Sequence, residues 1–121
     1  MKQVWKFPIE SESSCFAIKM PKGAIIRSFQ TQLVPRPSTL GEPPKKQNPV
    51  FTVVRDVEVP TIWAEVDLDG PKDKDFETES RVFCLVGTGH TLPSGQSLEY
   101  IGTAQMYQGS LVLHLYEIKE K

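Results

Sequence analysis

The amino-acid sequence predicts an all-β fold, a small antiparallel β-sandwich or partly open barrel with a long proline-rich insert loop. Ten prolines and eight glycines punctuate 121 residues, and no long stretch repeats its apolar residues with the 3.6-residue period of a helix. Valine, isoleucine, threonine and aromatic residues gather instead in short runs bounded by turn-forming residues, as strands do. A chain of this length fits a single domain, residues 1–121.

Eight such runs are predicted strands. They are Gln3–Phe7, Cys15–Lys19, Ala24–Gln32, Val50–Asp56, Thr61–Val66, Ser80–Gly87, Tyr100–Tyr107 and Leu111–Glu117. Met20-Pro21-Lys22-Gly23 is a predicted turn, because proline fixes φ and glycine accepts a positive φ. The last two runs form a predicted hairpin joined by the short loop Gln108-Gly109-Ser110.

Two stretches are predicted loops. Val34–Pro49 holds five prolines and, beyond Val34, a single large apolar residue, Leu40, so it buries too little surface to offset its ordering entropy. A loop of that length is usually either functional or disordered, and composition does not separate a lid from a tail-like loop. Asp67–Glu79 is acidic with interspersed lysines and is predicted to be exposed.

Alternation along the predicted strands assigns their faces. Ile62, Ala64 and Val66 are predicted to face the core, which leaves Trp63 and Glu65 on the opposite face. The final strand sets Leu111, Leu113 and Leu115 against Val112, His114 and Tyr116. In Ala24–Gln32, one predicted face carries Ile25, Arg27, Phe29 and Thr31. A face of aromatic and polar residues suits binding, although a solvated outer face of a sandwich has the same pattern.

Composition limits the classes of partner. The net charge of −1 gives no electrostatic reason to expect a DNA or RNA polymer or an anionic membrane. The N-terminal residues lack a signal-peptide pattern, and no run reaches the ~20 apolar residues that span a bilayer, so a cytoplasmic protein is expected. Cys15 and Cys84 can pair, but two cysteines in such a chain are more often free and buried, which is the expectation here.

The segment Val86-Gly87-Thr88-Gly89-His90, followed by Tyr100-Ile101-Gly102-Thr103, is the strongest candidate for a site. Glycines flanking a threonine let the backbone approach a ligand, and consecutive N–H groups in such a turn can bind an anion. The same residues also suit two tight strand ends with no ligand.

Eight residues form the predicted ligand-binding set: Arg27, Trp63, Arg81, Thr88, Gly89, His90, His114 and Tyr116. The two arginines would bind phosphate, Trp63 or Tyr116 would stack on a base, and the histidines would hydrogen-bond a sugar or phosphate. The competing interpretations are that the arginines are merely solvated and that Trp63 belongs to the core.

Catalytic and metal sites find no support in the sequence. No serine lies in a G-x-S-x-G elbow, and the acids around Asp67–Asp75 alternate with lysines on a predicted loop. Zinc-ligand spacings, a calcium loop and a phosphate-binding P-loop are absent from the sequence. We therefore expect no catalytic residues, no metal and no cofactor.

Several of these motifs together resemble a family of small bacteriophage proteins grouped as a domain of unknown function. The matching stretches are Val4–Pro8, Met20–Ala24, Ile62–Asp67, Val86–His90, Tyr100–Thr103 and Leu111–Glu117. The resemblance implies a phage origin and a small β fold, and it assigns no activity. Typical members are shorter, so residues from about Val34 to Pro60 depart from the pattern.

Small phage β-proteins include sponges that sequester nucleotide messengers of host antiviral systems. The resemblance and the candidate site together suggest a non-enzymatic counter-defence protein that binds a cyclic-oligonucleotide or ADP-ribose-type messenger in the host cytoplasm. Nanomolar affinity, about −12 kcal/mol, favours a ligand enclosed between protomers and hence a homo-oligomer. The alternatives are a module that binds a host protein or serves as a phage accessory, for example by strand addition, and a nucleotide-processing enzyme.

Overall fold

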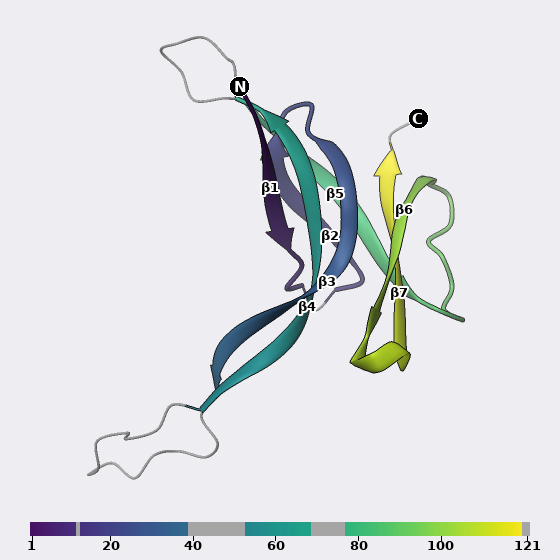
Figure 1. Cartoon of the computed structure of the whole chain (residues 1–121). Helices are drawn as coiled ribbons and strands as arrows, with labels where there is room; N and C mark the ends of the chain where they lie inside the picture. Colours follow the sequence, from purple (N-terminus) through teal and green to yellow (C-terminus); the bar gives the residue numbers. More distant parts are fainter. Residues whose placement is uncertain (12, 39–52, 69–76, 120–121) are drawn as a thin grey trace, which may run out of the picture.

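The structure, a computed structural model, describes residues 1–11, 13–38, 53–68 and 77–119. Seven strands and one short 3₁₀ turn follow one another along these residues (Figure 1). The strands are β1 Lys2–Pro8, β2 Cys15–Pro21, β3 Ile25–Ser38, β4 Val53–Asp67, β5 Thr78–Gly87, β6 Ser97–Met106 and β7 Leu111–Lys119, with the 3₁₀ turn η1 at Tyr107–Gly109. No helix in these ranges is long and apolar enough to cross a membrane.

The strands form two antiparallel sheets. Sheet A has the order β1-β4-β3, and sheet B has the order β2-β5-β7-β6. The sheets form an open β-sandwich, and strands β3 and β6 come together at one side, where the Thr31 hydroxyl donates to the Gln105 carbonyl at 2.8 Å. This confirms the predicted all-β sandwich.

The core lies between the two sheets and confirms the predicted faces of two strands. Ile62, Ala64 and Val66 of β4 are fully buried, while Trp63 and Glu65 are only partly buried on the outer face of sheet A. On β7, Leu115 is buried in the core, and His114 points to the other face. Phe83 and Met20 complete the core from sheet B.

The predicted face of Ala24–Gln32 is wrong because β3 contains a bulge between Ile26 and Ser28. The bulge shifts the alternation by one residue. Ile25 is therefore 46% exposed and Phe29 is buried, although the two were predicted to share a face.

Two of the predicted strands merge into one. Thr61–Val66 and the described part of Val50–Asp56 belong to the single strand β4, and β3 continues through Pro35 and Pro37 to Ser38. The prediction of a loop from Val34 is thus wrong for residues 34–38, because β4 provides a ladder for them. Residues 39–52 and 69–76 of the predicted loops lie outside the described residues.

The turns agree with the prediction and the cysteines do not. Gly23 has a φ of +81° in the first turn, and Gly109 has +88° in the β6–β7 hairpin. Cys15 and Cys84 form a disulfide, which corrects the expectation of free thiols. The physical reason is register: β2 pairs with β5 so that Cys15 lies directly opposite Cys84.

Candidate functional site on the outer face of sheet B

The Gly87–His90 segment forms a tight turn at the end of β5. The His90 N–H donates to the Gly87 carbonyl at 3.0 Å, and Gly89 has a φ of +88°, which favours glycine at the third position of such a turn. The Thr88 N–H donates to the Val112 carbonyl at 3.2 Å, which ties the turn to β7. The turn thus holds Thr88 and His90 beside the central strands of sheet B.

His114 lies at the centre of a hydrogen-bonded row. Its Nε2 is 2.8 Å from the Thr88 hydroxyl, and its Nδ1 is 2.9 Å from the Thr103 hydroxyl. The Tyr100 hydroxyl is in turn 2.5 Å from that of Thr103. A neutral imidazole donates from one nitrogen and accepts at the other, so one threonine accepts and the other donates. The row fixes the plane of the His114 ring.

This row borders a shallow pocket of about 210 Å³. Its lining is Val86, Gly87, Thr88, Gly89, His90, Leu92, His114 and Tyr116. Five of the eight predicted site residues, Thr88, Gly89, His90, His114 and Tyr116, therefore come together here from two separate segments. The Tyr116 ring packs edge to face on Tyr100, with 5.5 Å between the ring centres, so its orientation is fixed from the side.

The pocket offers hydrogen bonding and stacking rather than fixed positive charge. Among the residues that the structure describes, no lysine or arginine lines it. The N–H groups of Thr88 and His90 already donate to backbone carbonyls, so neither is available to an anion. Both ring nitrogens of His114 are bonded to threonine hydroxyls, so the His90 imidazole, the second lone pair of the Thr88 hydroxyl and the Tyr116 ring remain for a ligand. Such a set suits a sugar or a base better than a bare phosphate.

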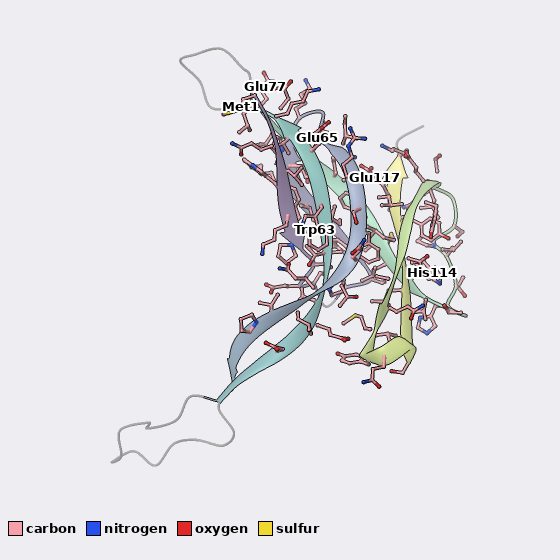
Figure 2. The ribbon with its side chains drawn as sticks, in the orientation of Figure 1. Met1, Trp63, Glu65, Glu77, His114 and Glu117 are labelled. Carbon is pink, nitrogen blue, oxygen red and sulfur yellow. A yellow bond between two sulfur atoms is a disulfide. The ribbon has the colours of Figure 1, made fainter. Side chains whose placement is uncertain are left out.

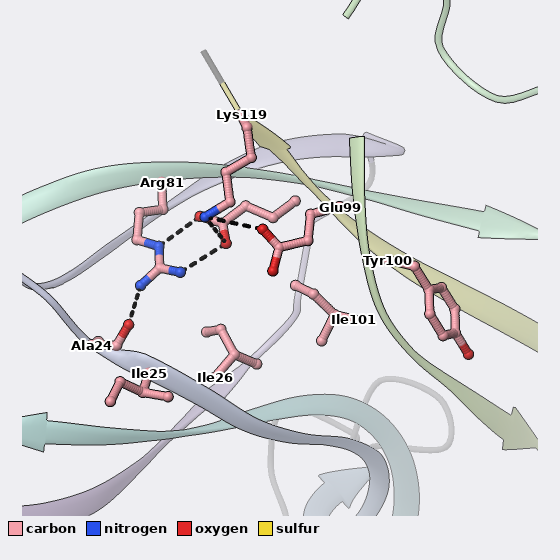
Figure 3. Close-up of a pocket in the computed structure, with 9 residues that line it drawn as sticks. Ala24, Ile25, Ile26, Arg81, Glu99, Tyr100, Ile101 and Lys119 are labelled. Carbon is pink, nitrogen blue, oxygen red and sulfur yellow. Dashed lines mark hydrogen bonds and ion pairs between the residues drawn. The ribbon is translucent and has the colours of Figure 1, made fainter. Parts of the chain in front are cut away.

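Arg81 lies elsewhere, on the inward face of sheet B (Figure 3). Its guanidinium donates twice to the Glu117 carboxylate, at 2.6 and 2.7 Å, and once to the Ala24 carbonyl at 2.5 Å. The hydrogen bond to Glu117 raises the pKa of Arg81 further above its ordinary value. Burial alone would raise the pKa of Glu117, but the hydrogen bonds and charges of Arg81 and Lys119 outweigh it and lower that pKa.

A cavity of about 320 Å³ adjoins this ion pair. Lys119 lies 3.2 Å from Glu117 and 3.4 Å from Glu99, so both cations around the cavity are paired with carboxylates. Opposite them, Ile25 and Ile26 of β3 form an apolar wall. Arg81 and Glu117 are largely buried, whereas Lys119 and Glu99 are 44% and 61% exposed. Each positive charge at the cavity thus has a negative partner.

The two remaining predicted residues belong to sheet A. Arg27 pairs with Glu65 at 3.0 Å on the outer face of that sheet, and its side chain is 55% exposed. Trp63 lies on the same outer face, well apart from His114 (Figure 2). The structure therefore brings neither residue to the pocket.

The predicted ligand-binding set omitted five residues of the pocket and the hydrogen-bonded row: Val86, Gly87, Leu92, Tyr100 and Thr103. Tyr100 and Thr103 belong to the Tyr100–Thr103 motif that the sequence singles out, and a bulge between Tyr100 and Gly102 keeps both on the face of His114. The predicted loop 108–110 pairs Tyr107 with Leu111 and hence Thr103 with Leu115, whereas the structure pairs Met106 with Leu111 and so places Thr103 opposite His114. Leu92 carries no comparable signal.

A smaller cavity of about 130 Å³ lies next to the pocket. His90 lines both, and the Cys15–Cys84 disulfide lines the smaller one. Within the described ranges, no three histidine, cysteine or acidic side chains are grouped to hold a metal ion.

A family model covers the whole chain, residues 1–121. The chain belongs to the DUF7352 family, a domain of unknown function. The match includes the proline-rich stretch that departs from the resemblance drawn above. No curated protein and no solved structure matches the chain. Membership of DUF7352 assigns no ligand to the pocket, whose chemistry must be argued from its residues.

Proposed function

We propose that this protein is a non-enzymatic binding protein that holds part of a nucleotide messenger in the His114 pocket. The observation that carries the proposal is the convergence of Thr88, His90, His114 and Tyr116 on one pocket. Tyr116 would stack on a base, and the His90 imidazole and the Thr88 hydroxyl, which His114 holds in place, would bind ribose or base edges. Base stacking on an aromatic side chain contributes about 1–3 kcal/mol per base in proteins that bind single strands.

The biological role proposed is counter-defence in a phage-infected cell, by sequestering a cyclic oligonucleotide or an ADP-ribose-type signal. The size of the pocket supports a shared ligand. Small-molecule sites usually measure roughly 300–1,000 Å³. The His114 pocket, at about 210 Å³, covers a base and its sugar but not a whole dinucleotide. A second protomer would enclose the remainder, which is the reason to propose a homo-oligomer.

A thermal-shift screen against cyclic di- and trinucleotides and cyclic ADP-ribose isomers tests this proposal. Ligand at 100 times its Kd adds about 2.7 kcal/mol of stability. With an unfolding entropy of about 2.1 cal/mol/K per residue, this corresponds to a rise in Tm of about 10 °C for this chain. Tyr116→Leu should weaken binding about 5- to 150-fold through the loss of stacking. Trp63→Leu, on the other sheet, is the matched control and should leave affinity unchanged.

A second candidate function is favoured by one observation, the 2.8 Å contact between Thr88 and His114. A hydroxyl beside an imidazole is the arrangement of a nucleophile and its base, and Thr103 holds the other ring nitrogen. The third group is a neutral hydroxyl rather than a carboxylate, so it would not stabilise an imidazolium. Chromatography of the recovered ligand separates the candidates: intact nucleotide supports binding, and altered nucleotide supports an enzyme.

A further inference from the structure

Strands β3 and β4 continue beyond the sandwich as a two-stranded arm (Figure 1). Leu33–Ser38 of β3 pairs with Val53–Glu58 of β4 in this arm. β1 accompanies β4 only as far as the pair Pro8 and Thr61. Among the described residues, no strand pairs with the arm on the side where β1 ends. Two-stranded ribbons are marginally stable in water, so a free arm edge of this kind is suited to a third strand.

One hydrogen bond fixes which backbone groups of β4 point to that free edge. The Ile9 N–H donates to the Pro60 carbonyl at 2.8 Å, so the backbone groups of residue 60 face the side of β1. Strand geometry alternates this direction from residue to residue. Along the arm, residues 54, 56 and 58 therefore direct N–H and C=O groups to the free edge, whereas Val57 and Val59 pair with β3.

The opposite edge of the arm is blocked. Because Val34 lies opposite Val57 in the ladder, the outward positions of β3 are Leu33, Pro35 and Pro37. Proline has no N–H and is confined to such outward positions in a sheet. In this stretch the outer edge of β3 thus has one backbone N–H donor, that of Leu33. The outer edge of β4 has three, those of residues 54, 56 and 58.

We infer that the β4 edge at residues 54–58 accepts an extended strand from another protein, with basic side chains facing Asp56 and Glu58. These two acids share one face of β4, and Asp56 is exposed. The Glu58 carboxylate is held in place by the Tyr107 N–H. Opposite charges directly across a strand pair stabilise it, and like charges destabilise it. The partner segment therefore alternates lysine or arginine with apolar residues.

Two copies of this edge paired with each other about residues 55–57 would oppose like charges. In an antiparallel pair, outward-facing residues lie opposite outward-facing residues. If Asp56 pairs with Asp56 of the second copy, two carboxylates lie directly opposite each other. If Val57 pairs with Val57, Asp56 of each copy lies opposite Glu58 of the other. Residue 55 is an arginine in both copies, so a register centred there opposes like charges as well.

An amide-resolved NMR titration with two synthetic peptides tests the inference. The probes are N-acetylated, C-amidated heptapeptides, one alternating lysine with valine and one alternating glutamate with valine. The lysine peptide should shift the amide signals of residues 54, 56 and 58. At low salt it should bind at least tenfold more tightly than the glutamate peptide. Equal binding of the two peptides, or unmoved signals at these positions, would overturn the inference.

Two proline variants locate the edge. Asp56→Pro removes a backbone N–H that points to the free edge and leaves the hydrogen bonds between β3 and β4 intact. This variant should bind the lysine peptide at least tenfold more weakly than the native protein does. Leu33→Pro, its counterpart on β3, should change the affinity less than twofold. Asp56→Asn keeps the N–H and isolates the contribution of the charge. Strong binding to Asp56→Pro, or loss of binding to Leu33→Pro, contradicts the assignment of the edge.

Peptides with altered backbones keep the test independent of protein folding. The lysine peptide is N-methylated at all its odd or at all its even positions, so that each version loses the donors along one of its edges. A strand added to β4 uses one edge of the peptide, so only one version should bind. Equal behaviour of the two versions overturns the inference.

Discussion

Replacing Glu117 with glutamine removes one charge from the inward face of sheet B and leaves the Arg81 guanidinium beside a neutral amide. Glu117 is 5% exposed and the Arg81 side chain 13%. Removing one member of a buried ion pair costs roughly 3–5 kcal/mol, because the other charge stays buried. Glu79 remains 4.0 Å from Arg81 and the Ala24 carbonyl still accepts a hydrogen bond, so the expected loss lies at the lower end, about 3 kcal/mol.

Urea and thermal unfolding measure this loss. An unfolding entropy of about 2.1 cal/mol/K per residue converts 3 kcal/mol into a fall in Tm of about 12 °C for this chain. Glu65→Gln is the control: it breaks the exposed Arg27–Glu65 pair and should cost less than about 1 kcal/mol. Arg81→Met combined with Glu117→Leu should lie within about 1 kcal/mol of the native protein, since apolar residues often replace a buried pair without loss. A fall in Tm of less than about 4 °C for Glu117→Gln would refute the reasoning.

The same pair predicts how stability depends on pH. Because the folded protein lowers the pKa of Glu117, its contribution is fully present above the unfolded pKa, near 4.3. It disappears as the pH falls through the lower folded value. The stability difference between the native protein and Glu117→Gln should therefore be constant from pH 5 to 8 and shrink below about pH 4. A difference that grows in acid would mean that Glu117 is neutral in the folded protein.

Three further substitutions have defined outcomes. Changing Cys15 and Cys84 together to serine removes a link across 69 residues of sequence; urea unfolding should show a loss of about 4 kcal/mol, and a loss below about 1 kcal/mol would contradict the entropic account. In Gly23→Ala the new Cβ meets no atom within 4 Å, but the residue keeps a φ of +81°. Calorimetry should therefore show a loss of about 1 kcal/mol in the free energy of unfolding. No loss would mean that the turn relaxes. Gly87→Ala would place its Cβ 3.1 Å from the His90 ring; the ring-proton signals of His90 should shift and nucleotide affinity should fall, and unchanged signals would show that the ring moves away freely.

Alternation made most of the fold predictable from sequence. The period of two along β4 and β7 determined which side chains enter the core, and glycines with positive φ determined two turns. The bulge in β3 was not predictable, because an inserted residue leaves no signal in a run of mixed polarity. The disulfide depended on knowing that β2 pairs with β5, which is a tertiary fact.

The site was half predictable for a similar reason. The turn at Gly87–His90 and the polar face of β7 are local patterns, so their residues were found. Arg81 was predicted as a phosphate ligand, but it lies outside the His114 pocket and pairs with Glu117. It shares one face of β5 with the apolar residues Phe83 and Leu85. Glu117 follows Leu115 by two residues in the same way. A charge on the apolar face of each of two strands is a sequence signal for an ion pair between them.

The order of strands in sheet B also bears on synthesis of the chain at the ribosome. In sheet B, β7, the last described strand, lies between β5 and β6 and pairs with both. A nascent chain that has not yet exposed β7 therefore leaves β5 and β6 with unpaired edges, although β2 and β5 can already pair and form their disulfide. β7 supplies His114 and Tyr116, so the pocket is complete only once this strand has been translated.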